Sequence, residues 1–226
     1  MNVLAVAHRG DPIAHRENTP AAFAAAVQAG AGMIELDVRC TADGEAVVVH
    51  DPTLERIWGV ATRVAEVRAA DVRALGIPDL AQALAAIPES VQVMVDYEER
   101  GVAEPALDAV LAAGALDRCL FSGDCYDGHR AIRGRAQDAR IACTWASDDP
   151  VSDALLDELG AEYWNPRGNV LACDPTQIER MHARGTLVSV WTIDRREDMQ
   201  FFLDLGVDAI ITNRVAELVE LLERVC

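Results

Sequence analysis

Short apolar runs alternate along this chain with longer stretches of helical period. Eight runs rich in β-branched and other apolar residues have the length of buried strands: 3–7, 33–38, 91–96, 118–122, 139–144, 161–165, 187–192 and 208–212. Ala- and Leu-rich stretches with the spacing of an apolar helix face separate or follow them: 20–29, 79–87, 103–113, 127–136, 151–159, 175–184, 196–205 and 214–225. Strict alternation predicts parallel strands joined by right-handed crossovers. Eight such units predict a (β/α)8 TIM barrel, a single domain over residues 1–226.

Two other architectures are compatible with the length of 226 residues. One is a pair of small domains, but the chain shows no linker between them. The other is a doubly wound open sheet, which is expected to carry a Gly-rich phosphate loop after its first strand; the segment "HRGDPIAH" is not such a loop. The alternation has one departure, at which the turn 41–44 precedes an extra strand, 45–51, that folds back onto the second strand.

Charge and composition narrow the functional classes. The formal net charge is -17, from 37 acidic and 20 basic residues, which argues against nucleic-acid binding because such surfaces are basic. The first apolar run, 3–7, is too short for a signal peptide, and no run approaches the roughly 20 apolar residues of a membrane span. We therefore expect a soluble cytoplasmic protein without stable membrane insertion, and nothing in the sequence indicates its oligomeric state.

Polar side chains follow several predicted strands at the point where each strand ends. His8 and Arg9 close the first strand, Glu35 and Asp37 share one face of the second, and Asp96 closes the third. The carboxyl ends of barrel strands meet at one mouth, where barrel enzymes carry out their chemistry. Three carboxylates there could hold a hard divalent cation, Mg2+ or Ca2+. With Arg9, such a cation would make a small positive site for one phosphate group in an acidic protein.

Two histidines could supply proton transfer at the same mouth. His50 and Asp51 end the fold-back strand, and Trp191 lies near the end of run 187–192. An imidazole, with an ordinary pKa of about 6.5, can act as base or acid near neutral pH, and cleaving a phosphodiester needs one of each. Taken singly, His50 could be a loop residue, Trp191 a core residue, and the paired acids a solvated rim. Their coincidence at one end of the barrel favours the functional interpretation.

The spaced motifs of segment 7–56 resemble those of the glycerophosphodiester phosphodiesterase family. They are His-Arg-Gly, Glu-Asn-Thr, Glu-Leu-Asp-Val, Thr-x-Asp-Gly and His-Asp, in the order and spacing of that family. The segment "VSVWTIDRREDMQFFLDLGVDAIITN" (188–213) is similar to the closing segment of the family. The resemblance implies a barrel enzyme, usually dependent on Mg2+ or Ca2+, that hydrolyses glycerophosphodiesters to glycerol 3-phosphate and an alcohol. In such enzymes the glycerol hydroxyl of the substrate is thought to attack phosphorus, giving a cyclic phosphate that water then opens.

The resemblance also implies a role for each matching residue. His8 and His50 would be the acid/base pair, and Glu35, Asp37 and Asp96 the metal ligands. Arg9 would bind the phosphate, Glu17 would lie near the phosphate or the metal, and Trp191 would line the apolar side of the glycerol pocket.

The chain departs from the family pattern in three places. The third strand of the family commonly ends in Glu-x-Lys, whereas residues 96–98 here are Asp-Tyr-Glu, so that Glu98 reverses a charge expected beside the phosphate. Segment 52–90 has little room for the small subdomain that the family often inserts, which predicts an open site. Asn213 stands where the family often has Asp.

These departures leave two alternatives open. The chain could be a phosphodiesterase acting on a related lipid or sugar phosphodiester, or a non-catalytic barrel that binds a phosphorylated metabolite. A panel of substrates separates the first alternative from glycerophosphodiester hydrolysis. Binding without turnover would identify the second.

Overall fold

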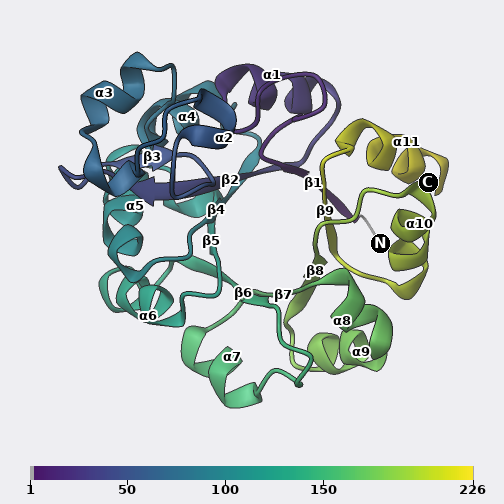
Figure 1. Cartoon of the computed structure of the whole chain (residues 1–226). Coiled ribbons are helices and arrows are strands. Elements are labelled where there is room, and N and C mark those ends of the chain that lie inside the picture. The colour runs from purple at the N-terminus through teal and green to yellow at the C-terminus, as the bar shows by residue number, and fades with distance from the viewer. Residues whose placement is uncertain (1–2, 226) are drawn as a thin grey trace.

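The computed structural model describes residues 3–225 and shows a closed barrel of parallel strands surrounded by helices (Figure 1). The strands are β1 (Leu4–His8), β2 (Met33–Cys40), β3 (Ala46–Val48), β4 (Gln92–Asp96), β5 (Cys119–Ser122), β6 (Arg140–Trp145), β7 (Tyr163–Pro166), β8 (Leu187–Val190) and β9 (Ala209–Thr212). Their order is β1-β9-β8-β7-β6-β5-β4-β2, and β1 pairs with β2 to close the ring. All of these barrel pairs are parallel. The predicted TIM barrel is confirmed.

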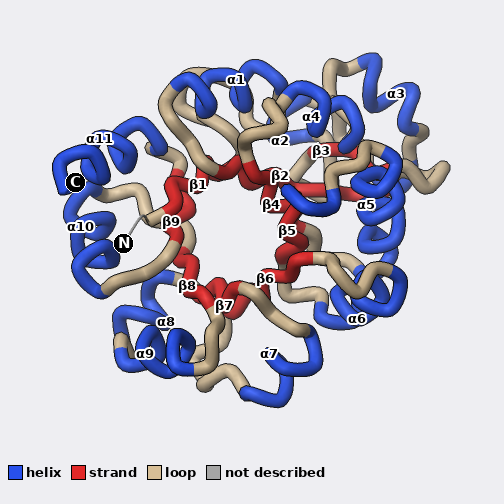
Figure 2. The backbone as a smooth tube through the Cα atoms, turned by 180° about the vertical axis from the view of Figure 1, so that it is seen from behind, coloured by secondary structure: helices blue, strands red, loops and turns tan. Residues whose placement is uncertain are grey.

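Helices form the outer layer of the ring, as the view from behind also shows (Figure 2). The crossover helices are α1 (Pro20–Gln28), α4 (Leu80–Ala86), α5 (Arg100–Ala112), α6 (Tyr126–Arg135), α7 (Asp153–Leu159), α9 (Thr176–Ala183), α10 (Arg196–Leu205) and α11 (Val215–Val225). Each matches a helix predicted from the sequence. Further short elements, α8 (Gly168–Cys173) and η2 (Leu116–Arg118), have too few residues to show a helical period.

The extra strand β3 is confirmed, and it carries a small satellite of the barrel. It pairs antiparallel with β2, with Val48 opposite Val38. After it come α2 (Glu55–Trp58), η1 (Val64–Glu66) and α3 (Ala69–Ala74), which Figure 1 shows projecting beside the ring. These elements share a hydrophobic cluster separate from the main core, made of Val47, Val49, Leu54, Val64, Val72 and Ile77. Segment 52–90 is short, yet it builds a compact unit. None of its residues lines the pocket at the mouth of the barrel that is described below.

Two layers of apolar side chains fix the barrel. The inner layer fills the ring and consists of Val6, Met33, Met94, Leu120, Ala142, Tyr163, Ala209 and Ile211. The outer layer lies between the strands and the helices and includes Ile34, Leu36, Val93 and Val95. Alternate residues of a strand therefore point into the barrel and towards the helices, as a period of two requires.

Local chemistry agrees with this architecture. Thr19 caps α1 by accepting a hydrogen bond from the Ala22 amide at 3.3 Å, and Pro20 occupies the first turn. The described cysteines are free, whereas Cys226 lies outside the described residues. Within residues 3–225 we find no helix with both the length and the apolar character needed to cross a bilayer.

Candidate active site

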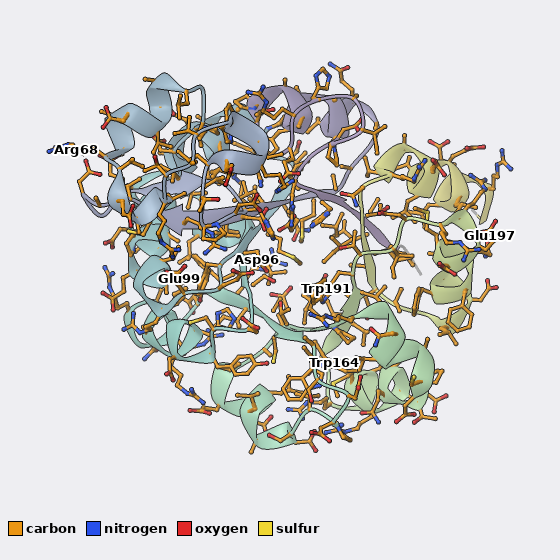
Figure 3. All side chains as sticks on the ribbon, in the orientation of Figure 1. Arg68, Asp96, Glu99, Trp164, Trp191 and Glu197 are labelled. Carbon is orange, nitrogen blue, oxygen red and sulfur yellow. The ribbon has the colours of Figure 1, made fainter. Side chains whose placement is uncertain are left out.

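The site residues form a polar layer next to the inner apolar layer, nearer the carboxyl ends of the strands. Two residues after an inward-facing apolar side chain, the strand again faces inward, and there the sequence turns polar: His8 follows Val6, and Asp96 follows Met94. On β2, Glu35 and Asp37 follow Met33 in the same way. The apolar layer closes the barrel interior and the polar layer forms the floor of its mouth. Figure 3 shows Asp96 and Trp191 at the centre of the ring, whereas Arg68 and Glu197 lie at its periphery.

A pocket at this mouth brings together seven of the eight site residues predicted from the sequence. It has an empty volume of about 720 Å³, open solvent included. Its walls include His8, Arg9, Glu35, Asp37, His50, Asp96 and Trp191. The eighth residue, Glu17, is not in the wall, but its Oε1 lies 3.2 Å from Nη1 of Arg9.

Arg9 is held between the acidic side chains by an unusual backbone conformation. Its φ of 59° is left-handed, a region that non-glycine residues seldom adopt. Its amide donates to Oε2 of Glu35 at 2.9 Å, and its Nε lies 3.0 Å from Oδ2 of Asp37. The next residue must be Gly10, because a Cβ there would approach the backbone of Ala22 to 2.6 Å. The His-Arg-Gly motif is therefore a tight turn that presents Arg9 to the pocket.

The carboxylates carry more negative charge than Arg9 balances. Asp37 and Asp96 are direct neighbours in the pairing of β2 with β4. Burial and the charge of Asp37 raise the pKa of Asp96 to about 7, and burial with the charges of both aspartates raises the pKa of Glu35. Oxygen donors with surplus negative charge fit Mg2+ or Ca2+. As the side chains stand, however, no three acidic, His or Cys residues among 3–225 are grouped so that they could hold a metal ion, and Oδ2 of Asp37 accepts from Nδ2 of Asn18 at 2.7 Å.

A chain of hydrogen bonds fixes the ring of His8. The side-chain amide of Asn213 donates to Oδ2 of Asp194 at 2.8 Å, so that its Oδ1 faces His8 and accepts from Nδ1 at 2.8 Å. A neutral His8 must then carry its proton on Nδ1 and leave Nε2 with a free lone pair. Burial and the charge of Arg9 lower the pKa of His8, against the opposing effect of Asp37. Asn213, in place of the more usual Asp, thus still orients the ring.

His50 is oriented by a different chain. Its Nδ1 donates to Oδ1 of Asp51 at 2.6 Å, which leaves Nε2 free. Arg56 donates to Asp51 from Nε to Oδ2 at 2.5 Å and from Nη2 to Oδ1 at 3.0 Å. It also donates from Nη2 to Oε1 of Glu17 at 2.7 Å. The hydrogen bond from Arg56 lowers the pKa of Asp51 to about 2. Because Glu17 also contacts Arg9, ion pairs run without a break from Asp37 to Asp51, the hydrogen-bond partner of His50.

The charge reversal at Glu98 has a partner in the structure. Nη2 of Arg39 donates to Glu98 at 2.6 Å, and its Nη1 donates to Glu99 at 2.7 Å. Arg39 is buried at the end of β2, and its Nε also donates to the carbonyl of His50 at 2.6 Å. Glu98 still lines the pocket, but its charge is shared with a cation.

Sequence reasoning missed a second cation of the pocket, Arg167. It follows β7, and its guanidinium lies 5.4 Å from the ring centroid of Trp191. Nε1 of Trp191 donates to the carbonyl of Asn165 at 2.9 Å, which sets the ring in the wall. The signal was present, since Arg167 lies just beyond the predicted strand 161–165 at the same mouth. Arg9 and Arg167 give the pocket positive charge on both sides.

Comparison with known proteins agrees with this geometry. The profile of the glycerophosphoryl diester phosphodiesterase family matches residues 8–217. A glycerophosphodiester phosphodiesterase of Caldanaerobacter subterraneus is 28% identical over 99% of both chains. A probable glycerophosphodiester phosphodiesterase 2 of Mycobacterium tuberculosis is 30% identical, over 93% of this chain and 87% of its own.

Solved structures share the fold. A glycerophosphodiester phosphodiesterase from Thermotoga maritima superposes with a TM-score of 0.85 at 22% identity, covering 98% of this chain and 99% of its own. A phosphodiesterase from Oleispira antarctica in complex with the product sn-glycerol-3-phosphate gives a TM-score of 0.87 at 19% identity, with 97% and 96% covered. The family match spans nearly the whole chain and begins at His8 of the site. This chain belongs to the glycerophosphoryl diester phosphodiesterase family of phosphoric diester hydrolases.

Proposed function

We propose that this chain hydrolyses glycerophosphodiesters to sn-glycerol 3-phosphate and an alcohol, using His8 and His50 for proton transfer. The observation that carries the proposal is the gathering of both imidazoles, two guanidiniums and five carboxylates around one pocket. The names of the similar proteins and the product complex of the Oleispira protein support the substrate class.

The two histidines divide the proton transfers. The lowered pKa of His8 keeps it neutral with a free Nε2, which suits a base that takes the proton of the attacking hydroxyl. Asp51 accepts from Nδ1 of His50 and fixes the orientation of that ring, which suits a group that protonates the departing alkoxide. When water opens the cyclic phosphate that the family resemblance implies, the two rings exchange roles.

Charge at the phosphate comes from the protein and from a cation. Arg9 and Arg167 reach the pocket from β1 and β7 and can bind the non-bridging oxygens. Glu35, Asp37 and Asp96 would hold Mg2+ or Ca2+. Such an ion, when bound, neutralises negative charge on the phosphoryl oxygens.

Release of glycerol 3-phosphate from glycerophosphoethanolamine, with Mg2+, Ca2+ or a chelator, tests the proposal. His8→Ala and His50→Ala should each lower kcat by about 10²-fold or more. His182→Ala is the matched control, because His182 pairs with Asp208 away from the pocket. Equal rates in all three variants would refute the assigned roles, and no release from any glycerophosphodiester under any metal condition would refute the proposal.

A further inference from the structure

A buried arginine connects the loops on the two sides of β2. Arg39 lies near the end of this strand, between the edge strand β3 and the barrel strand β4 in the order of the sheet. Its side chain is only 10% exposed, and its three guanidinium nitrogens donate to the carbonyl of His50 after β3 and to the carboxylates of Glu98 and Glu99 after β4. The guanidinium therefore joins the segment that carries His50 to the barrel.

The backbone of His50 has little other support. The antiparallel pairing of β3 with β2 ends at Val48, so His50 lies beyond the last paired residue. Among the backbone hydrogen bonds that residues 3–225 make outside helices and strands, none involves the amide or the carbonyl of His50. Nε of Arg39 donates to that carbonyl at 2.6 Å. The point from which the His50 ring enters the pocket therefore depends on Arg39.

The contact with His50 depends in turn on the two glutamates. A guanidinium stays charged in proteins, and a buried charge without a counter-ion is costly. The side chains of Glu98 and Glu99 are 56% and 59% exposed, yet each places a carboxylate oxygen within 2.7 Å of Arg39. A single carbonyl would leave most of the charge of Arg39 uncompensated. The two glutamates thus stabilise the guanidinium in the place from which it reaches His50.

We propose that Arg39 is a positioning residue: it fixes the backbone from which His50 reaches the departing alcohol, and Glu98 and Glu99 hold it there as counter-ions. The inference rests on the proposed function, since His50 is the acid proposed there. Arg39 does not line the pocket, so it acts through His50 and not on the substrate. The negative charge of Glu98 then has a use that does not involve the phosphate.

The test compares two esters of glycerol 3-phosphate that differ in their need for an acid. Ethanolamine leaves as a strongly basic alkoxide that must be protonated, whereas para-nitrophenol leaves readily as its anion. Release of each alcohol is measured in a single turnover, with the enzyme saturating and in excess. The rate constant for ethanolamine divided by that for para-nitrophenol gives a leaving-group ratio. This ratio does not depend on the fraction of a variant that is folded.

The variants of Arg39 are compared with loss of the acid itself. His50→Ala should lower the leaving-group ratio by about 10²-fold or more. Arg39→Gln should lower it by about tenfold, because it displaces His50 without removing it. Arg39→Lys keeps the positive charge and should lower the ratio less than Arg39→Gln.

Arg118→Gln is the matched control. Arg118 also holds backbone carbonyls, those of Leu84 and Val91, but it does so at the amino end of β5, away from the mouth of the barrel. The variant should keep the wild-type leaving-group ratio.

The double variant Glu98→Gln/Glu99→Gln tests the counter-ions. It should lower the leaving-group ratio about as far as Arg39→Gln does. In an Arg39→Gln background it should lower the ratio no further, because the three residues act as one unit.

Two outcomes overturn the inference: an unchanged leaving-group ratio in Arg39→Gln, and an equal loss in the Arg118 control. A further loss from the double variant in the Arg39→Gln background would overturn the role of the glutamates as counter-ions. In all three cases, a lowered ratio in His50→Ala would leave the proposed function standing. An unchanged ratio in His50→Ala would refute the acid role of His50 and this inference together.

Discussion

Arg56 should control the catalytic use of His50 although it does not line the pocket. It is bidentate to Asp51 and also holds Glu17, and it is the link that joins His50 to the network of Arg9. Replacing it with alanine frees Asp51 to turn and lets the imidazole of His50 turn with it. The perturbation therefore acts on the position of the imidazole proposed as the acid.

The magnitude follows from exposure and geometry. The Arg56 side chain is 47% exposed, so that each of its two ion pairs contributes only about 0.2–1 kcal/mol to folding. We expect Arg56→Ala to lose about 1 kcal/mol of stability. The effect on activity should be larger than the effect on stability, because Arg56→Ala lets the His50 ring move. We expect kcat to fall about tenfold, which is less than the roughly 10²-fold loss that a displacement of 1 Å can cause. Arg56→Lys keeps the positive charge but loses the two-pronged guanidinium, so its kcat should lie between those of wild type and Arg56→Ala.

The pH dependence of stability has a definite sign. Because the pKa of Asp51 is lowered to about 2, its ion pair stabilises the fold fully above its unfolded pKa of about 4. The contribution disappears as pH falls from about 4 to about 2. The difference in Tm between wild type and Arg56→Ala should therefore vanish in acid.

The assay measures kcat and KM for glycerophosphoethanolamine together with thermal melting. Arg73→Ala is the control, since Arg73 pairs with Glu45 and Asp79 in the same part of the chain but not at the pocket. In an Asp51→Asn background, Arg56→Ala should have little further effect on kcat, because it is the contact with Asp51, not the one with Glu17, through which Arg56 positions His50. An unchanged kcat in Arg56→Ala, or a full additive loss in the double variant, would refute the reasoning.

Three further predictions follow from the site. Arg167→Ala should raise KM about tenfold or more by removing charged hydrogen bonds to phosphate, whereas Arg195→Ala, on an exposed side chain, should not; steady-state kinetics compares them. In chelator, stability should fall from about pH 4 to about pH 7, at up to about 1.4 kcal/mol per pH unit, because the raised pKa of Asp96 keeps a proton that the unfolded chain loses; Mg2+ or Ca2+ should restore Tm mainly near pH 8, as melting curves can show. Gly10→Ala should destabilise by about 2 kcal/mol or more through the clash with Ala22 at left-handed φ, measured by urea unfolding.

The sequence predicted the barrel and the floor of its mouth because both depend on short-range periodicity. The period of two along 33–38 places Glu35 and Asp37 above Met33, and no tertiary information is needed for that step. Strict alternation of strands and helices then decides where the strand ends meet.

What the sequence did not predict depends on loops. Arg56 reaches Asp51 and Glu17 only because α2 and the turn before α1 come together, and neither loop conformation has a periodic signature. The pairing of Arg39 with Glu98 joins positions 59 residues apart. The place of Arg167 just after a predicted strand could have pointed to the mouth of the barrel. Its contact with Trp191 could not be predicted, because Trp191 lies in a later segment of the chain.

The satellite supports only one of the two histidines to which we assign proton transfer. His8 stands on a strand of the closed ring, whereas His50 lies just after β3, where Val47 of β3 and the following Val49 pack into the separate cluster of the satellite. A small cluster of this kind can open on its own, at a lower free energy than the ring requires. Heating would then displace His50, the proposed acid, while His8, the carboxylates and the barrel stay in place. Inactivation and melting become separate events, with amides of segment 47–77 exchanging hydrogen before those of β1.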